Sequence, residues 1–144
     1  LACDLVVASE NARFGTAFLG VGWHPDSGAT YYLTRLIGPH KAKELFFTGR
    51  TVDAKEADKL GLVNMVLPAD KFELEVLNLA KTIASGPLKV IMLTKKAVNK
   101  ALDADLASAI ATEIEGCKIA AQTKDFAEGI KAILEKRKPN FVGE

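Results

Sequence analysis

One carboxylate in the stretch Phe14–Gly38 lies where acid/base chemistry could take place. Asp26 follows a glycine-rich run ending at Gly22, which we expect to be extended, and a tight corner at residues 23–25. It stands directly before residues that predict a helix, and apolar side chains surround it in the sequence. A carboxylate at the mouth of a helix, next to apolar groups, is suited to accepting and releasing a proton.

Asp26 also has a structural interpretation, and the residues alone favour it. Asp is a good N-cap residue because its carboxylate accepts the free amide N–H groups of the first helical turn, and the helix dipole adds to this. Two sharper motifs are incomplete here. Gly20 and Gly22 begin a dinucleotide fingerprint, but Pro25 takes the place of its third glycine. The residues around Ser27 lack two glycines of a nucleophile elbow, so Ser27 is expected to be a helix residue.

The composition limits the classes of protein that this chain can belong to. It has 144 residues, of which 49% are hydrophobic, and a net charge of +1, which suits one domain or part of a larger one. The charge argues against a nucleic-acid partner, and no apolar run reaches the length of a membrane span. There is no signal-peptide pattern, so we expect a cytoplasmic protein. Cys3 and Cys117 are expected to be buried and reduced.

The histidines and the basic tail are the remaining polar candidates. His24 and His40 have no zinc-type spacing, so no metal site is expected. His24 could orient a reacting group beside Asp26, or it could simply be solvated. Trp23 either lines a pocket or fills the corner. Lys136 lies in a basic helix end that would complement the helix dipole.

The residue patterns predict a mixed front third and a helical remainder. Apolar residues at helical spacing in that remainder are expected to form core or subunit contacts. Asp53 and Glu56 have the form of a capping box, and Gly38 and Gly61 are expected to close helices. The expected strands cover 4–9, 12–16 and 62–67. The expected helices cover 27–37, 39–48, 54–60, 68–84, 88–102, about 106–119 (capped by Asp103 or Asp105) and 126–136.

Short motifs along the chain resemble, in their order and spacing, the crotonase (enoyl-CoA hydratase/isomerase) family. They lie at Cys3–Ala8, Ala12–Gly15, Gly22–Thr30, Leu33–Gly38, Ala42–Glu44, Thr48–Gly49, Ala54–Ala57, Gly61–Val63 and Lys136–Phe141. The resemblance implies an α/β chain, the C-terminal half of a crotonase-like spiral fold. Residues 1–68 would then end the core spiral with its acyl-CoA pocket, and 69–144 would form a helical trimerisation region.

The start of the chain also predicts a fragment. Leu1 stands almost directly before the apolar run Leu5–Ala8, without a cap or turn. The resemblance places both oxyanion-hole donors upstream of Leu1, together with the first of the two glutamates that hydratases use. Because such donors stabilise the charge that develops in the reaction, we expect the chain alone to be inactive.

The resemblance also implies roles for individual residues. The second hydratase glutamate falls on Phe18, which cannot act as an acid or base and would instead form a wall of the acyl pocket. Asp26 matches the aspartate that carries proton transfer in dienoyl-CoA and epoxyphenylacetyl-CoA isomerases, the groups with the most similar motifs. In a dehalogenase branch the same position is a nucleophile. The implied substrate contacts are Phe18, Val21, Trp23, His24 and Lys136.

We therefore expect an acyl-CoA isomerase in which Asp26 is catalytic. Coenzyme A would be part of the substrate, and no separate cofactor is expected. Lys136 would touch the nucleotide end of coenzyme A, although Ile133 replaces a phenylalanine common in relatives. The expected assembly is a homo-oligomer, a trimer or hexamer. An enoyl-CoA hydratase, a dehalogenase-like enzyme and a non-catalytic assembly module remain alternatives.

Overall fold

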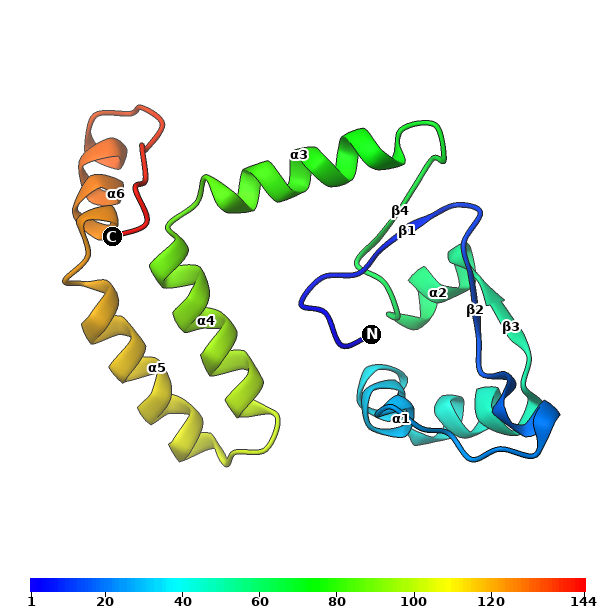
Figure 1. Cartoon of the computed structure of the whole chain (residues 1–144). Coiled ribbons are helices and arrows are strands. Elements are labelled where there is room, and N and C mark those ends of the chain that lie inside the picture. The colour runs from blue at the N-terminus through cyan, green and yellow to red at the C-terminus, as the bar shows by residue number, and fades with distance from the viewer. The chain divides into compact units, whose positions relative to one another are not determined.

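The computed structural model describes residues 1–144, which form two compact units, Leu1–Val76 and Leu77–Glu144. The first unit contains all the strands, and α3 crosses from one unit to the other (Figure 1). The predicted α/β class is confirmed. The elements are β1 (Val7–Ser9), β2 (Arg13–Gly15), the 3₁₀ helix η1 (Ala17–Val21), α1 (Ala29–Thr48), β3 (Thr51–Asp53), α2 (Ala54–Leu60), β4 (Met65–Leu67), α3 (Phe72–Ala84), α4 (Leu88–Ala101), α5 (Leu106–Ala120) and α6 (Lys124–Leu134).

Two small sheets hold the first unit together. β1 pairs in parallel with β4, and β2 pairs antiparallel with β3, placing Phe14 opposite Val52. The Glu10 amide donates to the Leu67 carbonyl at 2.8 Å, which extends the first pairing. The three predicted strands are present but shorter, and β3 is an additional strand that the sequence patterns did not predict.

The glycine-rich run that ends at Gly22 is extended only at its start, in β2, which corrects the sequence-based expectation for the rest of the run. Residues 17–21 form η1, and Gly22 closes it with a left-handed backbone at φ 67°. The Gly22 and Trp23 amides donate to the carbonyls of Leu19 and Phe18 at 3.0 and 2.9 Å. These bonds satisfy the end of the short helix, so the chain enters the corner from a fixed position.

α1 consists of two limbs that meet at Gly38, as the sequence predicted. Gly38 has φ 75° and ψ 163°, a conformation that interrupts the helix, and Pro39 begins the second limb. Proline is suited to this place because it has no amide N–H to leave unpaired. The first limb, however, starts at Ala29 rather than at Ser27.

The core of the first unit joins α1 to the strands and α2. Phe18 packs against this core from η1, with its ring centroid 6.3 Å from that of Phe46. The hydroxyl of Thr16 donates to the Leu45 carbonyl at 2.7 Å, which fastens the start of η1 to α1. The buried core residues are Ala8, Leu33, Ala42, Leu45, Phe46, Val52, Ala54, Ala57, Leu62 and Val63.

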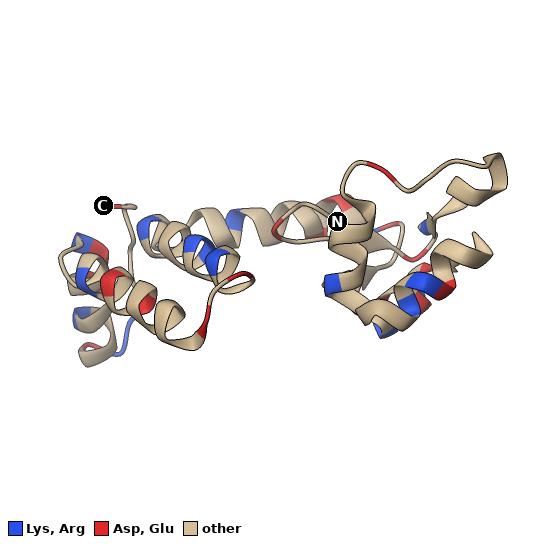
Figure 2. Cartoon of the chain, turned by 90° about the horizontal axis from the view of Figure 1, so that it is seen from below, with Lys and Arg blue, Asp and Glu red and all other residues tan.

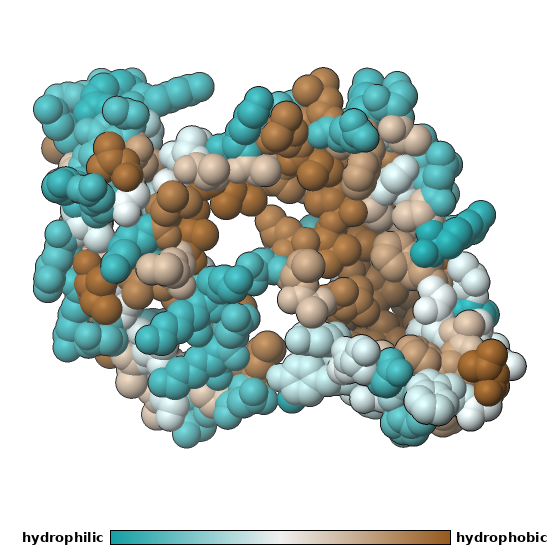
Figure 3. Space-filling view, viewed as in Figure 1, coloured by the Kyte–Doolittle hydropathy of each residue, from teal (hydrophilic) through white to brown (hydrophobic).

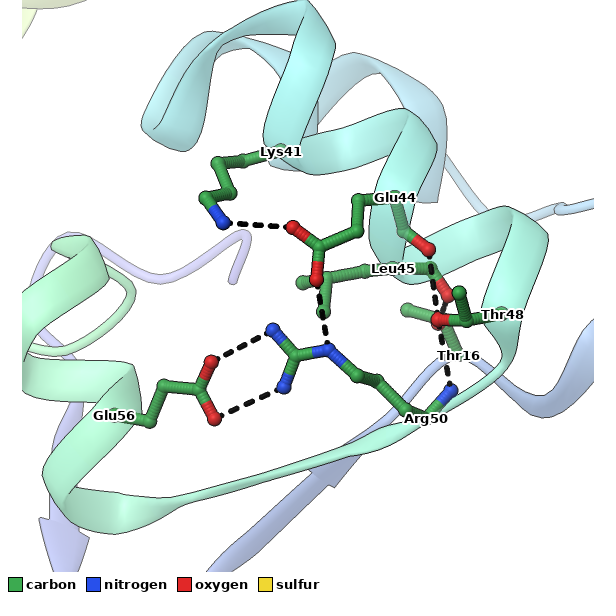
Figure 4. Close-up of polar contacts among 7 residues, drawn as sticks. All are labelled: Thr16, Lys41, Glu44, Leu45, Thr48, Arg50 and Glu56. Carbon is green, nitrogen blue, oxygen red and sulfur yellow. Dashed lines mark hydrogen bonds and ion pairs between the residues drawn. The ribbon is translucent and has the colours of Figure 1, made fainter.

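A charged network around Arg50 connects α1 with α2 (Figure 4). The Arg50 guanidinium donates to both carboxylate oxygens of Glu56, at 2.9 and 2.7 Å, and to Glu44 at 2.9 Å. Lys41 donates to the other Glu44 oxygen at 2.7 Å. Lys41 and then Arg50 hold the pKa of Glu44 below its usual value, and Arg50 does the same to the pKa of Glu56. Both carboxylates therefore stay ionised in the network.

The predicted helix caps are largely confirmed. The Asp53 carboxylate accepts the Glu56 amide at 2.8 Å, which is the first half of a capping box, while the Glu56 side chain turns to Arg50 instead of closing the box. Asp105, one of the two predicted alternatives, caps α5, and Thr123 caps α6.

The helices of the second unit bury few side chains within this chain. α4 and α5 have no buried residue, and the expectation that Cys3 and Cys117 are buried is wrong. Cys117 lies in α5 and lines an open pocket between α4 and α5, and Cys3 lies in an irregular segment before β1. Figure 3 shows apolar surface over α3 and, in the first unit, around β1, β4 and α2.

Charges are distributed rather than clustered. Figure 2 shows Lys and Arg interspersed with Asp and Glu in both units. No single helix is long and apolar enough to cross a membrane, and only the bent pair α3 and α4 passes such a test of length and composition.

The C-terminal tail folds back onto α6 through two carboxylates. Asp125 is only 1% exposed, and its two oxygens accept the amides of Val142 and Gly143 at 2.7 and 2.9 Å. Glu128 accepts two hydrogen bonds from Arg137, at 2.6 and 2.9 Å. These bonds fix the segment that follows Lys136.

Acid should weaken this attachment of the tail. The Arg137 guanidinium, followed by the Asn140 amide, lowers the pKa of Glu128 from 4.5 to about 2. Because the pKa is lower in the folded state, the contribution of Glu128 is complete above its ordinary pKa and is lost as the pH falls toward about 2. We expect Glu128→Gln to lower Tm most at about pH 6, and the difference from wild type to shrink on acidification.

The measurement is thermal unfolding followed by circular dichroism across this pH range. Glu115→Gln, an exposed change in α5, is the matched control and should follow the wild-type curve. A Tm difference for Glu128→Gln that stays constant with pH would contradict the prediction.

Candidate functional site

Asp26 lies in a tight turn outside α1, so the predicted N-cap role is wrong. Its backbone carbonyl accepts the Ala29 amide at 2.9 Å, while Ser27 and Gly28 have φ values of 53° and 78°. These angles match a type I′ turn, in which both central residues are left-handed. The N-cap is Gly28, and no side chain caps the helix. The Asp26 carboxylate is thus exposed and does not cap the first turn of α1.

Trp23 contacts the Asp26 carboxylate. The indole Nε1–H donates to Oδ2 at 3.1 Å, across the corner formed by His24 and Pro25. The sequence predicts only an apolar role for Trp23, although an indole carries one hydrogen-bond donor that can reach a nearby acceptor. His24 does not contact Asp26 through any hydrogen bond described here, and its Nδ1 lies 2.7 Å from the Pro25 carbonyl oxygen.

Phe18 lines a pocket of about 370 Å³ in the first unit. The pocket is mainly apolar, with Arg13, Thr16 and Arg50 as its polar members, and Phe14 and Phe46 form part of its wall. Asp26 does not line it. The pocket is large enough to hold an apolar group of modest size.

Phe18, Val21 and Trp23 do not enclose Asp26 within this chain. Val21 is 83% exposed and Trp23 is 61% exposed, whereas Phe18 turns toward the core. Phe18 does so because its ring packs against Phe46. The proposed substrate contacts of these residues remain predictions.

Lys136 belongs to the second unit and follows the end of α6. Its φ is 52°, and its amide donates to the Ile133 carbonyl at 3.2 Å, while the Arg137 amide donates to the Ala132 carbonyl at 3.0 Å. This pair of bonds is a Schellman motif, with lysine at the position that glycine usually occupies. The exposed Lys136 side chain is available to an anionic group, and its predicted contact with coenzyme A stays a prediction.

No group of three or more His, Cys, Asp or Glu side chains is arranged to hold a metal ion. Asp26 is the only Asp or Glu between Glu10 and Glu44. An exposed carboxylate with one oxygen engaged by a neutral donor can accept or donate a proton through its other oxygen.

Comparison with known proteins gives the family. The model of the enoyl-CoA hydratase/isomerase family matches residues 1–144, so the chain belongs to that family. It is 37% identical over its full length to a crotonyl-CoA hydratase from Syntrophomonas wolfei and covers 55% of that protein. It is 36% identical to a short-chain-enoyl-CoA hydratase from Clostridium acetobutylicum, with 96% of this chain and 53% of that protein aligned.

Solved structures agree with the fold. The enoyl-CoA hydratase from Bacillus anthracis matches with a TM-score of 0.93 and 38% identity over 99% of this chain and 55% of that one. The enoyl-CoA hydratase/isomerase from Cupriavidus metallidurans CH34 matches with a TM-score of 0.91 and 38% identity, over 98% and 53%. The resemblance to the crotonase family is confirmed, and the chain spans about half the length of these relatives.

Proposed function

We propose that the full-length protein binds an acyl-CoA thioester and moves a proton next to it, shifting a double bond or opening a ring, with Asp26 as the acid/base group. The observation that carries this proposal is the geometry of Asp26. Its carboxylate is exposed on a fixed turn, one oxygen accepts the Trp23 N–H at 3.1 Å, and no other carboxylate lies between Glu10 and Glu44. A single positioned carboxylate suits a reaction that removes and returns one proton.

Phe18 favours isomerisation over hydration. The resemblance places the second glutamate of the hydratases at this position, and a phenylalanine cannot transfer a proton. Phe18 instead packs beside Phe46 and lines the apolar pocket, which supports its proposed role as a wall of the acyl site. Val21, at the end of η1, is proposed to contact the substrate together with Trp23 and His24 of the corner that follows.

Hydration is the second candidate, because relatives of this chain are named as hydratases. The crotonyl-CoA hydratase from Syntrophomonas wolfei and the short-chain-enoyl-CoA hydratase from Clostridium acetobutylicum both carry that name. In this case Asp26 would have to assist the addition of water, by activating the water or by supplying the proton, without the glutamate that Phe18 replaces. The two reactions differ in their products, which separates them by direct analysis.

The test supplies the full-length protein with 2-enoyl-CoA and 3-enoyl-CoA substrates and identifies the products by mass and by NMR. Hydration adds the mass of one water, whereas isomerisation leaves the mass unchanged and moves the double bond. We expect isomerisation in deuterated water to introduce deuterium at a carbon next to the shifted double bond. Water addition as the main reaction would favour the second candidate, and turnover of neither substrate would overturn the proposal.

Self-association is expected through the second unit. Leu106, Ile133 and Leu134 are 76%, 75% and 78% exposed, and such large apolar side chains are commonly covered by a partner. The proposed assembly is a homo-oligomer, a trimer or hexamer. Sedimentation velocity of the full-length protein should show one of these species at micromolar concentrations. A stable monomer would contradict the proposed assembly while leaving the acyl-CoA chemistry untested by this measurement.

A further inference from the structure

We infer that Trp23 is a positioning residue for Asp26, which engages one carboxylate oxygen so that the other oxygen carries the proton. The inference rests on the proposed function and deepens it. Its basis is the hydrogen bond of 3.1 Å from the Trp23 indole Nε1–H to Asp26 Oδ2. Because both residues lie in one short corner, the contact can be set by local backbone geometry alone.

The backbone is fixed on both sides of this contact. On one side, the Trp23 amide donates to the Phe18 carbonyl at 2.9 Å, which ties the corner to η1. On the other side, the Ala29 amide donates to the Asp26 carbonyl at 2.9 Å and closes the turn before α1. The start of η1 is itself attached to α1 through Thr16. These hydrogen bonds therefore fix the backbone on both sides of the corner, which holds the indole next to the carboxylate.

The turn between the two anchors is strained at one residue. Ser27 has φ 53°, a left-handed conformation that a residue with a Cβ atom adopts at a cost. Strained residues of this kind persist where the surrounding structure determines the backbone. Asp26 precedes this turn, where its carboxylate caps no helix amide and accepts the hydrogen bond of the indole.

The chemistry of indole explains what the contact can do. The Nε1–H is a donor only and does not titrate, so it holds Oδ2 whatever the protonation state of its surroundings. Oδ1 accepts none of the hydrogen bonds that the structure gives to Asp26 and is the oxygen assigned to proton transfer. A fixed carboxylate approaches its substrate in one orientation, which lowers the entropic part of the barrier.

Two substitutions distinguish the effect of the Trp23 N–H donor from the effect of its ring. Trp23→Phe keeps an aromatic ring and removes the N–H, whereas Trp23→Gln places an amide N–H the same number of bonds from Cβ and removes the ring. In the full-length protein, with the acyl-CoA that it turns over, we expect Trp23→Phe to lower kcat by about 10-fold with a smaller change in KM. Trp23→Gln should recover part of kcat. An equal loss of kcat in both variants, or full activity of Trp23→Phe, would overturn the inference.

Failure of the inference is distinguishable from failure of the proposed function. If Asp26→Asn is inactive while Trp23→Phe is fully active, the proposed function stands and the positioning role does not. If both variants are fully active, the proposed function itself fails. Melting temperatures of the variants exclude loss of folding as the cause.

Fluorescence gives a readout that does not depend on activity. Trp23 is the only tryptophan in this chain, and its emission is isolated by subtracting the spectrum of Trp23→Phe. Acid titration should change this emission as the carboxylate gains a proton, and Asp26→Asn should remove that change. His24 is the other titratable group in the corner, so His24→Gln serves as the control and should retain it. If acid changes the emission of Asp26→Asn as much as it changes that of the wild type, the contact is absent.

Discussion

Replacing Asp26 with Asn is expected to lower kcat/KM of the full-length protein by about 10²–10⁴, the usual contribution of a general acid or base. Asn has nearly the same shape and keeps one oxygen that can accept the Trp23 N–H, but it cannot carry the proton. Because α1 is capped by Gly28, the substitution removes no helix cap. The melting temperature should therefore stay close to that of the wild type.

Asp58→Asn is the matched control for this experiment. Asp58 is an exposed aspartate in α2 of the same unit, outside the turn and the pocket. Its replacement should leave both kcat/KM and Tm unchanged. Full activity of a well-folded Asp26→Asn variant would remove Asp26 from the mechanism and would direct the search to His24 or to another residue of the full-length protein.

Removal of the Asp125 carboxylate is expected to destabilise the second unit by about 2–4 kcal/mol, since two backbone donors lose a charged acceptor in a buried place. Asp125 is 1% exposed and accepts the amides of Val142 and Gly143. In Asp125→Ala no other side chain replaces this acceptor. The tail beyond Arg137 should then detach more readily from α6.

Hydrogen exchange measured by NMR tests this prediction at the two donors. The amides of Val142 and Gly143 should lose protection in Asp125→Ala, and denaturant unfolding should report the lower stability of the unit. Glu115→Ala, an exposed change in α5, should alter neither measurement. Equal protection of both amides in wild type and Asp125→Ala would show that the carboxylate does not hold the tail.

The features that the sequence predicted correctly depend on neighbouring residues. Gly38 interrupts α1 and Gly61 ends α2 because each adopts a positive φ, and both are recognisable as glycines following helical patterns. Asp53 and Asp105 cap their helices through amides three residues later. Such contacts are contained within one turn of chain, so residue type and spacing suffice to predict them.

The features that the sequence missed depend on distant or unusual partners. β3 has only three residues and exists through its pairing with β2, which no local pattern reveals. Asp125 resembles an ordinary acidic residue in the first turn of a helix, and its burial depends on amides 17 and 18 residues later.

Within the candidate site, the sequence identified Asp26 by its residue type but not by its surroundings. Ser27 has a left-handed φ without being Gly or Asn, so nothing in the sequence marks the turn that moves Asp26 off the helix. The exposure of Val21 and Trp23 could not be predicted either, because it is a property of the folded chain that residue type does not reveal.

The interruption of α1 at Gly38 has a consequence for how this sequence can vary. With φ 75° and ψ 163°, Gly38 occupies a region that only glycine reaches without strain, although a Cβ atom there would meet nothing within 4 Å. The restriction is therefore on the backbone and not on space, so no compensating change in a neighbouring side chain can relieve it. In a saturation library selected for folding, position 38 should retain glycine alone, while Gly116, with an ordinary helical backbone and equal space, should accept alanine.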